Sequence, residues 1–286
     1  MTPTEVEFLG KFLKERSGLV LIGDKSYLIE SRLMPVARKH NMPSLSALMQ
    51  HLRTGNPSLE SEVVEAMTTN ETFFFRDKLP FDLFSETMLP HMQKARATQR
   101  RLRIWCAACS TGQEPYSLAM LLEEAAEKFP GWNFEILATD LSGEVLAKAK
   151  SGRFSQFEVQ RGLPIQMLVK NFEQVGDMWE VSPKIKSKVQ FRPVNLLRDF
   201  SPFGSFDIVF CRNVLIYFDE PTKVDVLNRL AGTLAPDGFL VLGAAETVVG
   251  LCDRFKSVPD KRGLYVRNVA LEAQHPPMRI AVGAGR

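Results

Sequence analysis

Polar residues follow an apolar run at 102–108, and their types suit the binding of a small molecule. The loop at 107–114 lies between that run and a helical pattern that Pro115 opens. In α/β proteins, such a loop brings backbone close to a ligand. Gly112 is its only glycine, so the loop favours a ligand without phosphates over a pyrophosphate cradle. An ordinary connecting loop is the alternative.

Asp140 stands at the end of a second apolar run, 133–140. A carboxylate at this position can accept hydrogen bonds from both hydroxyls of a ribose. The alternative is a local role, in which Asp140 caps the next helix together with Ser142.

A third apolar run, 206–211, passes directly into Arg212 and Asn213, and Tyr217 follows shortly after. Polar groups that interrupt an apolar run at the edge of a sheet make poor core residues and good site residues. Tyr217 offers a phenol beside that edge. Half-buried packing explains Tyr217 equally well.

Segment 68–76 combines hydroxyls, an amide and Arg76 with three consecutive phenylalanines. The rings can seal an apolar face while Arg76 presents a planar cation to an anion. A helix cap followed by core residues would give the same pattern.

Strands and helices alternate after residue 100, and they must position these residues. The predicted strands are 102–108, 133–140, 188–196, 206–212, 238–243 and 264–268, and the predicted helices are 115–129, 142–150 and 222–234. This alternation requires crossover connections. It predicts an α/β fold with a doubly wound, mostly parallel sheet, which binds ligands beyond the carboxyl ends of its strands.

The first 90 residues show helical spacing only. Thr4 and Glu7 form a capping-box pattern, and Gly18 is a stop signal. Pro35 predicts a kink or a boundary in a helix at 26–40. Ser44 and Ser58 each begin a further helix.

These patterns divide the chain into parts. We predict an all-helical N-terminal domain at 1–88, an α/β domain at 89–270, a small inserted antiparallel β-subdomain at about 163–190, and a disordered tail at 271–286. A junction rich in cations, 91–103, separates the first two. Within the insertion, Gly176 and Asp177 stand between apolar runs and favour a tight hairpin turn.

Composition excludes several classes of protein. The chain has 286 residues, and 36 Lys and Arg against 33 Asp and Glu give a net charge of +3, too near neutral to indicate nucleic-acid binding. No apolar run approaches the roughly 20 residues of a membrane span, and the N-terminus lacks a signal-peptide pattern. Four cysteines make no disulfide framework, and Cys106-x₂-Cys109 has no second ligand pair for a metal. We expect a soluble cytoplasmic protein without a metal.

Five motifs together resemble the chemotaxis receptor (CheR-type) methyltransferase family. They are TTNETFFFRD (68–77), IWCAACSTGQEPYSLAM (104–120), ATDLS (138–142), VNLL (194–197) and FDIVFCRNVLIYFD (206–219). They occur in the family's order and span nearly the whole chain. The resemblance implies a Rossmann-like methyltransferase that uses S-adenosylmethionine to esterify glutamates of chemoreceptors, with S-adenosylhomocysteine as the other product.

The resemblance also implies a role for each matching residue. The implied cofactor-binding residues are Asn70, Thr72, Arg76, Glu114, Asp140, Asn195, Leu196, Arg212 and Asn213. Glu114 would contact the methionine amino group, Asp140 the ribose hydroxyls, and Asn195 with Leu196 the adenine. Arg76 would also orient the substrate carboxylate, and Tyr217 would lie beside the transferred methyl group. A cationic sulfonium without phosphates suits a loop that carries an acid and few glycines.

The implied partner is the cytoplasmic helical bundle of a chemoreceptor, reached by a monomer recruited to membrane receptor arrays without membrane insertion. Segment 25–53 carries a local charge of +4, and its Arg32, Arg38 and Lys39 are candidates for docking an acidic helix. A solvated helix face is the alternative.

Family members that grip a receptor's C-terminal peptide have a longer loop in the insertion. The short stretch 175–179 therefore predicts a member independent of that tether. Two other functions stay open: methyl transfer to RNA or a small molecule, and a cofactor-bound signalling module without turnover.

Overall fold

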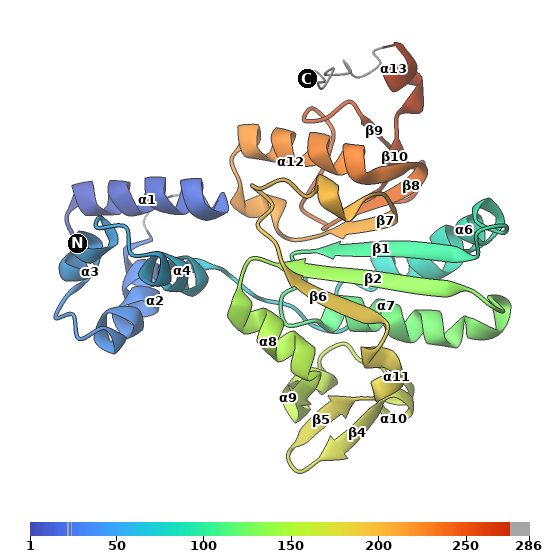
Figure 1. Ribbon diagram of the computed structural model, residues 1–286, viewed down its shortest axis with the longest axis horizontal. Helices are drawn as coiled ribbons and strands as arrows, with labels where there is room; N and C mark the ends of the chain where they lie inside the picture. Colours follow the sequence, from blue (N-terminus) through green and yellow to red (C-terminus); the bar gives the residue numbers. More distant parts are fainter. Residues whose placement is uncertain (22, 24, 275–286) are drawn as a thin grey trace, which may run out of the picture.

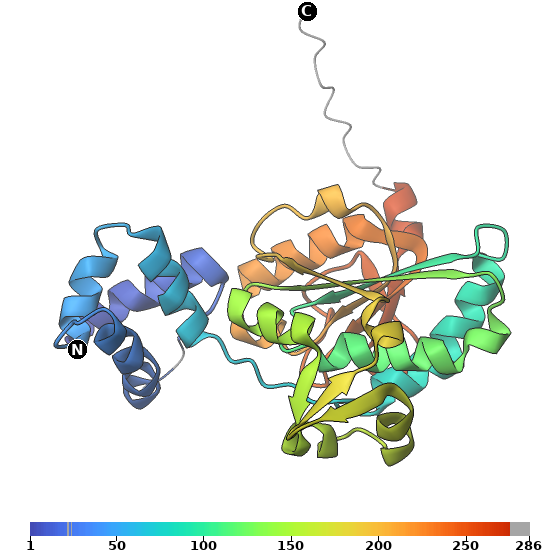
Figure 2. The same ribbon diagram turned by 60° about the horizontal axis from the view of Figure 1, so that its bottom comes forward.

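The computed structural model describes residues 1–21, 23 and 25–274. A group of N-terminal helices lies beside a larger α/β domain, and one extended segment joins them (Figures 1 and 2). The N-terminal helices are α1 (Pro3–Ser17), α2 (Ser26–Lys39), α3 (Leu45–Leu52) and α4 (Pro57–Met67). They enclose a core of their own, which includes Leu13, Leu33 and Val63.

The start of α1 differs from its prediction. Thr2 and Glu5 form the capping box, with Pro3 in the first turn, so the pair Thr4 and Glu7 was the wrong choice. Both pairs have the same spacing, and the proline fits only the earlier start. Gly18 ends the helix in the left-handed conformation, as predicted.

The other N-terminal helices show one match and two further differences. The helix boundary that Pro35 allowed is absent, because α2 continues past it with its buried face packed into the helical core, which outweighs the lost hydrogen bond. The alternative of a kink at Pro35 stays a prediction. Ser44 caps α3 as predicted. α4 begins at Pro57, because the Asn56 side chain accepts hydrogen bonds from the first turn, so the predicted start at Ser58 was late.

A seven-stranded sheet forms the centre of the α/β domain, in the order β6-β2-β1-β7-β8-β10-β9. Its strands are β1 (Arg101–Ala107), β2 (Asn133–Asp140), β6 (Val189–Pro193), β7 (Phe206–Cys211), β8 (Leu234–Leu242), β9 (Phe255–Ser257) and β10 (Leu264–Arg267). The pairs that involve β1, β2, β6, β7 and β8 with one another are parallel, whereas β10 runs antiparallel to β8 and β9. The mostly parallel sheet is therefore confirmed.

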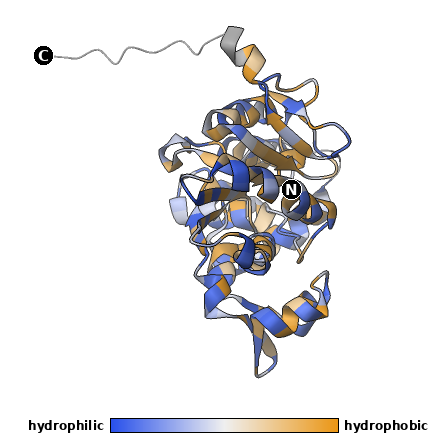
Figure 3. Ribbon diagram, turned by 90° about the vertical axis from the view of Figure 1, so that its right-hand side faces the viewer, coloured by the Kyte–Doolittle hydropathy of each residue, from blue (hydrophilic) through white to orange (hydrophobic). Residues whose placement is uncertain are grey.

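Side chains of β1 alternate between two apolar cores, as the pleat of a strand requires. Ile104 and Cys106 enter one core, and Trp105 and Ala107 enter the other. Helices α7 (Gln113–Glu124) and α8 (Gly143–Ser151) cover one face, and α12 (Glu220–Thr233) covers the opposite face (Figure 1). Figure 3 shows apolar and polar residues intermingled along these elements, which is typical of helices with one buried side.

Seven further helices of the described residues lie outside the insertion between β2 and β6. They are α5 (Leu79–Leu83), the π-helix η1 (Phe84–Met88), α6 (Leu89–Ala95), η2 (Ala126–Lys128), η3 (Ser201–Phe203), η4 (Leu215–Tyr217) and α13 (Val269–Gln274). The helix that Pro115 was predicted to open begins two residues earlier, because Gly112 turns the chain in the left-handed region. The predicted disordered tail starts inside α13, and its part at 275–286 lies outside the described residues.

The insertion between β2 and β6 forms a second, three-stranded antiparallel sheet, in the order β3-β5-β4. Its elements are β3 (Arg153–Ser155), α9 (Gln156–Gln160), α10 (Ile165–Asn171), β4 (Phe172–Val175), β5 (Met178–Val181) and α11 (Pro183–Lys186). Val175 pairs with Met178, so Gly176 and Asp177 make the predicted two-residue turn. The sheet already begins at Arg153, earlier than the predicted span of 163–190.

Candidate functional site

A cleft opens at the carboxyl ends of the central strands, beside the N-terminal helices. The neighbours of β1 are β2 on one side and β7 on the other, so the strand order reverses here. Open α/β sheets bind ligands at this point. The sequence-predicted residues of the site all line the cleft: Asn70, Thr72, Arg76, Glu114, Asp140, Asn195, Leu196, Arg212, Asn213 and Tyr217.

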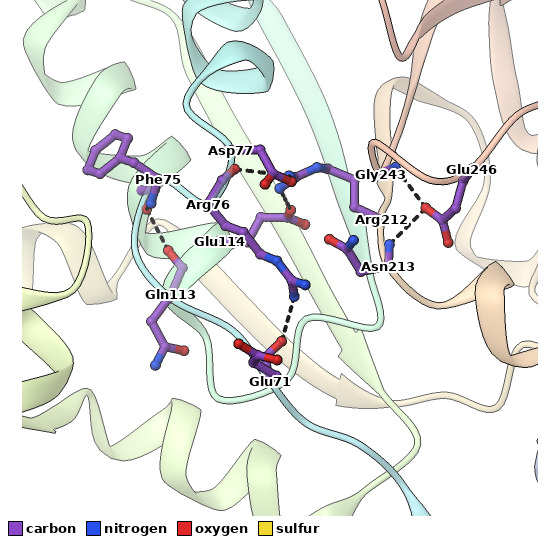
Figure 4. A network of polar contacts seen from close by, with 11 residues as sticks. Glu71, Phe75, Arg76, Asp77, Gln113, Glu114, Arg212, Asn213, Gly243 and Glu246 are labelled. Carbon is purple, nitrogen blue, oxygen red and sulfur yellow. Dashed lines mark hydrogen bonds and ion pairs between the residues drawn. The ribbon is translucent and has the colours of Figure 1, made fainter.

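The segment that joins the two domains forms one wall of the cleft. Ser110 Oγ donates to the carbonyl of Asn70 (2.8 Å), and the Phe75 N–H donates to Ser117 Oγ (3.1 Å). Arg76 Nη1 donates to the carbonyl of Glu71 (2.6 Å), which folds its guanidinium back along the segment (Figure 4). Phe74 is fully buried. Phe74 therefore fits the interpretation of this segment as core, whereas Arg76 lines the cleft, and its role toward an anion stays a prediction.

Asp140 is buried and holds the neighbouring loop in place. Its Oδ2 accepts a hydrogen bond from the Ser110 N–H (2.8 Å), and its Oδ1 accepts one from the Ser142 N–H (3.0 Å). Burial raises the pKa of the Asp140 carboxyl, and these backbone donors oppose the shift. The helix-capping role that the sequence left open belongs to Ser142, whose hydroxyl accepts from the Val145 N–H (3.3 Å).

A buried ion pair ties β7 to α7 and to the joining segment. Arg212 Nη1 lies 2.7 Å from Glu114 Oε2, and Arg212 Nη2 lies 2.7 Å from Asp77 Oδ2 and 2.9 Å from the carbonyl of Arg76 (Figure 4). Burial raises the pKa of the Glu114 carboxyl, and Arg212 opposes that shift. Removal of either partner would leave an uncompensated charge inside the protein.

Strained backbone gathers around the cleft. Non-glycine residues with a positive φ include Phe75 (52°), Asp77 (66°), Ala108 (60°), Ser110 (50°) and Asn213 (59°). Each costs on the order of 1–3 kcal/mol, and such residues persist mainly where function needs the conformation. Residue types alone did not reveal this strain.

The end of α1 supplies cleft residues that the sequence did not indicate, namely Ser17 and Leu19. Gly18 turns the chain there, and a Cβ on it would lie 2.8 Å from the Phe218 ring. The Val20 N–H donates to the carbonyl of Tyr217 (2.9 Å). Tyr217 is half-buried against the α12 side of the core, so the packing interpretation also holds for it. In the sequence, the only indication that this segment could matter was Gly18, a helix-stop glycine that precedes apolar residues.

Further polar contacts fasten the N-terminal helices to the α/β domain around the cleft. Asn195 Nδ2 donates to the carbonyl of Arg16 (2.7 Å), and Glu65 Oε1 accepts from the Gly143 N–H (2.6 Å). An ion pair joins Lys14 to Asp219 (2.6 Å) and lowers the pKa of Asp219 to about 2. The cleft therefore has walls from both domains.

The predicted docking residues lie on α2, outside the cleft. Arg32 donates to the carbonyls of Met67 (2.7 Å) and Thr68 (2.9 Å), so it braces the end of α4. Lys39 pairs with Glu62 (2.9 Å). Arg38 is exposed, and its side chain makes no polar contact within the described part of the chain.

The four cysteines are all buried and unpaired with one another. Cys106 and Cys109 are free and buried, and burial raises the pKa of both thiols. Among the residues that the structure describes, no group of His, Cys, Asp and Glu side chains could hold a metal ion. None of the described helices is long and apolar enough to span a membrane.

Comparisons with known proteins agree on one family. Residues 70–264 match the SAM-binding domain of CheR methyltransferases, and residues 4–68 match the all-alpha domain of the same family. The chain therefore belongs to the CheR methyltransferases, which use S-adenosylmethionine.

Relatives that match over most of their length carry names that agree with this family. Chemotaxis protein methyltransferase 1 of Pseudomonas aeruginosa is 43% identical over 92% of this chain and 97% of its own. The relative of the same name in Vibrio cholerae is 43% identical over 90% and 94%. The chemotaxis protein methyltransferase of Salmonella typhimurium is 34% identical over 86% and 84%.

The cleft residues fit S-adenosylmethionine by their chemistry. Asp140 is a buried acceptor, Leu196 is a buried apolar surface, and Glu114 is an acid that suits a cation. Gly112 is the single glycine of the loop after β1, which therefore lacks the composition of a phosphate cradle.

Proposed function

We propose that this protein transfers the methyl group of S-adenosylmethionine to glutamate carboxylates on chemoreceptor helices. The products are glutamate methyl esters and S-adenosylhomocysteine, and the reaction serves adaptation in chemotaxis. The observation that carries the proposal is the cleft, which gathers acids, two arginines and a tyrosine from the joining segment and the α/β domain in a member of the CheR methyltransferases. We further propose that it works as a monomer in the cytoplasm, at receptor arrays.

Each side of the cleft suits one part of the cofactor. Asp140 would accept hydrogen bonds from the ribose hydroxyls, because each of its oxygens has a lone pair beyond the one used by backbone. Asn195 and Leu196 would flank the adenine. Glu114 would attract the methionine amino group. Four further residues would complete the site: Asn70, Thr72, Arg212 and Asn213.

The substrate side needs orientation more than acid–base catalysis. A glutamate is ionised at pH 7, so its oxygen can attack without a general base. The cofactor supplies an electrophilic methyl group, whose bond to sulfur breaks as the bond to oxygen forms. Arg76 would orient the carboxylate without quenching it, and Tyr217 would shape the path of the methyl group. Orientation of this kind supplies several kcal/mol.

Receptor recognition would use the exposed side of α2. The local excess of cations in 25–53 suits an acidic helix of a receptor bundle. Arg38 is the best placed, because Arg32 and Lys39 already have partners within the protein. The tight two-residue turn at Gly176 and Asp177 supports a protein that needs no receptor tether.

Radiolabelled methyl transfer to receptor-containing membranes tests this proposal. We expect label on the receptor that mild base releases, because an ester is base-labile. Receptors that lack their C-terminal peptide will be labelled equally well, and a large loss of rate with them would contradict tether independence. Preferential labelling of RNA or a small molecule, or binding of the cofactor without any transfer, would identify one of the other functions instead.

A further inference from the structure

Glu246 organises backbone beside the cleft without lining it. Its Oε1 accepts hydrogen bonds from the N–H groups of Val214 (2.9 Å), Leu215 (2.8 Å) and Ile216 (3.3 Å). Its Oε2 accepts from the N–H groups of Asn213 (2.8 Å) and Gly243 (2.7 Å), as Figure 4 shows. The residue is only 9% exposed. One carboxylate thus satisfies the donors of a whole turn.

That turn carries cleft residues. The cleft lining includes Asn213, Val214 and Tyr217 of this turn. Among the described residues, Glu246 does not line the cleft. Asn213 adopts a left-handed φ of 59°, a conformation that needs support from its surroundings. Four successive N–H groups that converge on one acceptor provide such support, because an unmet buried donor costs about 1–3 kcal/mol.

Gly243 shows independently that the backbone after β8 packs tightly against Glu246 and Asn213. A Cβ on Gly243 would lie 2.7 Å from Glu246 Oε2 and 2.8 Å from Asn213 Nδ2. Its φ lies outside the left-handed region that favours glycine, so the contact is what excludes a larger residue. The end of β8 therefore leaves room for one carboxylate between itself and the turn after β7.

We propose that Glu246 is a positioning residue of the cofactor site, acting through the turn at 213–217. The inference rests on the proposed placement of the cofactor in the cleft. A carboxylate is required because all five of its partners are donors. A glutamine would turn its own N–H₂ group toward two or three N–H groups, whichever way its amide lies.

The test compares three variants in the full chain by calorimetric titration with S-adenosylhomocysteine and by thermal unfolding. In Glu246→Gln, the new side chain has nearly the same shape as the old one. Gly243→Ala leaves the carboxylate of Glu246 intact but places a methyl group against it and against Asn213. Asp207→Asn is the matched control, because Asp207 is also a buried carboxylate that accepts a backbone N–H, that of Arg103 (2.8 Å), but at the opposite end of β7.

We expect Glu246→Gln and Gly243→Ala to weaken the binding of S-adenosylhomocysteine by roughly tenfold or more at a temperature where both are folded. Asp207→Asn will lower the melting temperature and keep the wild-type affinity. Wild-type affinity in both Glu246→Gln and Gly243→Ala would overturn the inference, as would an equal loss in Asp207→Asn. Failure of the wild-type protein to bind would instead count against the proposed function. If Glu246→Gln fails to fold, Gly243→Ala alone decides.

Discussion

The single carboxylate of Asp140 both holds neighbouring backbone in place and lines the cleft. Its oxygens fix the loop at Ser110 and the start of α8 at Ser142, and they also line the cleft. The sequence placed Asp140 at the end of its strand, and the structure confirms that position. The backbone donors could not be foreseen, because they depend on how the loop after β1 folds.

Asp140→Asn will weaken the binding of S-adenosylhomocysteine. The amide loses the charge and turns an N–H₂ group toward one of its partners, which costs about 1.5–3 kcal/mol for a hydrogen bond to a charged group. Titration calorimetry measures the change. Asp199→Asn is the control, because Asp199 accepts from the Ser201 N–H in a similar local turn outside the cleft. Equal affinity of Asp140→Asn and wild type would contradict the ribose role.

Binding will also depend on pH. Burial raises the pKa values of Asp140 and Glu114 above 3.8 and 4.5, so both carboxyls take up protons at a higher pH than exposed acids do. The ionised forms are those that bind a cation and accept from hydroxyls. Affinity for S-adenosylmethionine will therefore be full near neutrality and fall on acidification, with a midpoint above those values. Affinity that stays constant down to pH 4 would be incompatible with both roles.

Arg76→Ala will lower turnover at saturating cofactor and receptor, by on the order of tenfold to a hundredfold, because the carboxylate loses its orientation. Steady-state methylation rates at several concentrations of both substrates measure this effect. Arg76→Lys will restore little, since a lysine lacks the planar fork of the guanidinium. Reduced cofactor affinity with unchanged turnover at saturation would show that Arg76 does not orient the substrate.

At the scale of elements, the sequence predicted most accurately the strands that consist of a continuous apolar run. The buried strands β1, β2 and β7 lie within a residue or two of their predicted spans. Errors came where two local signals competed, as at Thr2 and Thr4, or where tertiary packing overrode a breaker, as at Pro35 in α2. The short strand β9 has too few residues to show a period.

Two arginines of α2 differ in what their charge does: Arg38 is exposed, whereas Arg32 is hydrogen-bonded within the protein. Arg38→Ala will raise the KM for receptor a few-fold and flatten its dependence on salt, because an exposed cation acts through a screened, long-range attraction. Arg32→Ala is a different kind of change, since it also removes the brace on Met67 and Thr68 and will lower the melting temperature. Methylation assays across a range of ionic strength distinguish them. An unchanged salt dependence in Arg38→Ala would refute docking through this face.

At the scale of the whole molecule, the cleft lies where two domains meet, each packed around apolar residues of its own. Leu19 and Ser17 face residues of the central sheet across the cleft. Sequence motifs located the α/β side correctly, because they lie at strand ends. They could not show that the end of α1 completes the cleft, since that follows from how the two domains dock.

Hydrogen exchange will report this docking. A ligand that binds only the docked arrangement of the two domains stabilises it by about 2.7 kcal/mol at a hundred times its Kd, and we expect this of S-adenosylhomocysteine. Amides at the domain contact, such as the Val20 N–H that donates to Tyr217, will exchange more slowly with ligand. Amides in α3 lie within the N-terminal core and serve as the internal control. Equal protection of Val20 with and without ligand would mean that the N-terminal helices do not take part in binding.

The joining segment has a consequence for building chimeras within this family. The two matched domains meet at residues 68 and 70, which invites a crossover at that point. Yet the residues just beyond it are held by Ser110, Ser117 and Arg212 of the α/β domain, while Arg32 holds the carbonyl of Thr68 from the other side. A hybrid that exchanges receptor preference must therefore keep residues 70–77 with their own sheet, and must keep Arg32 with its own helices.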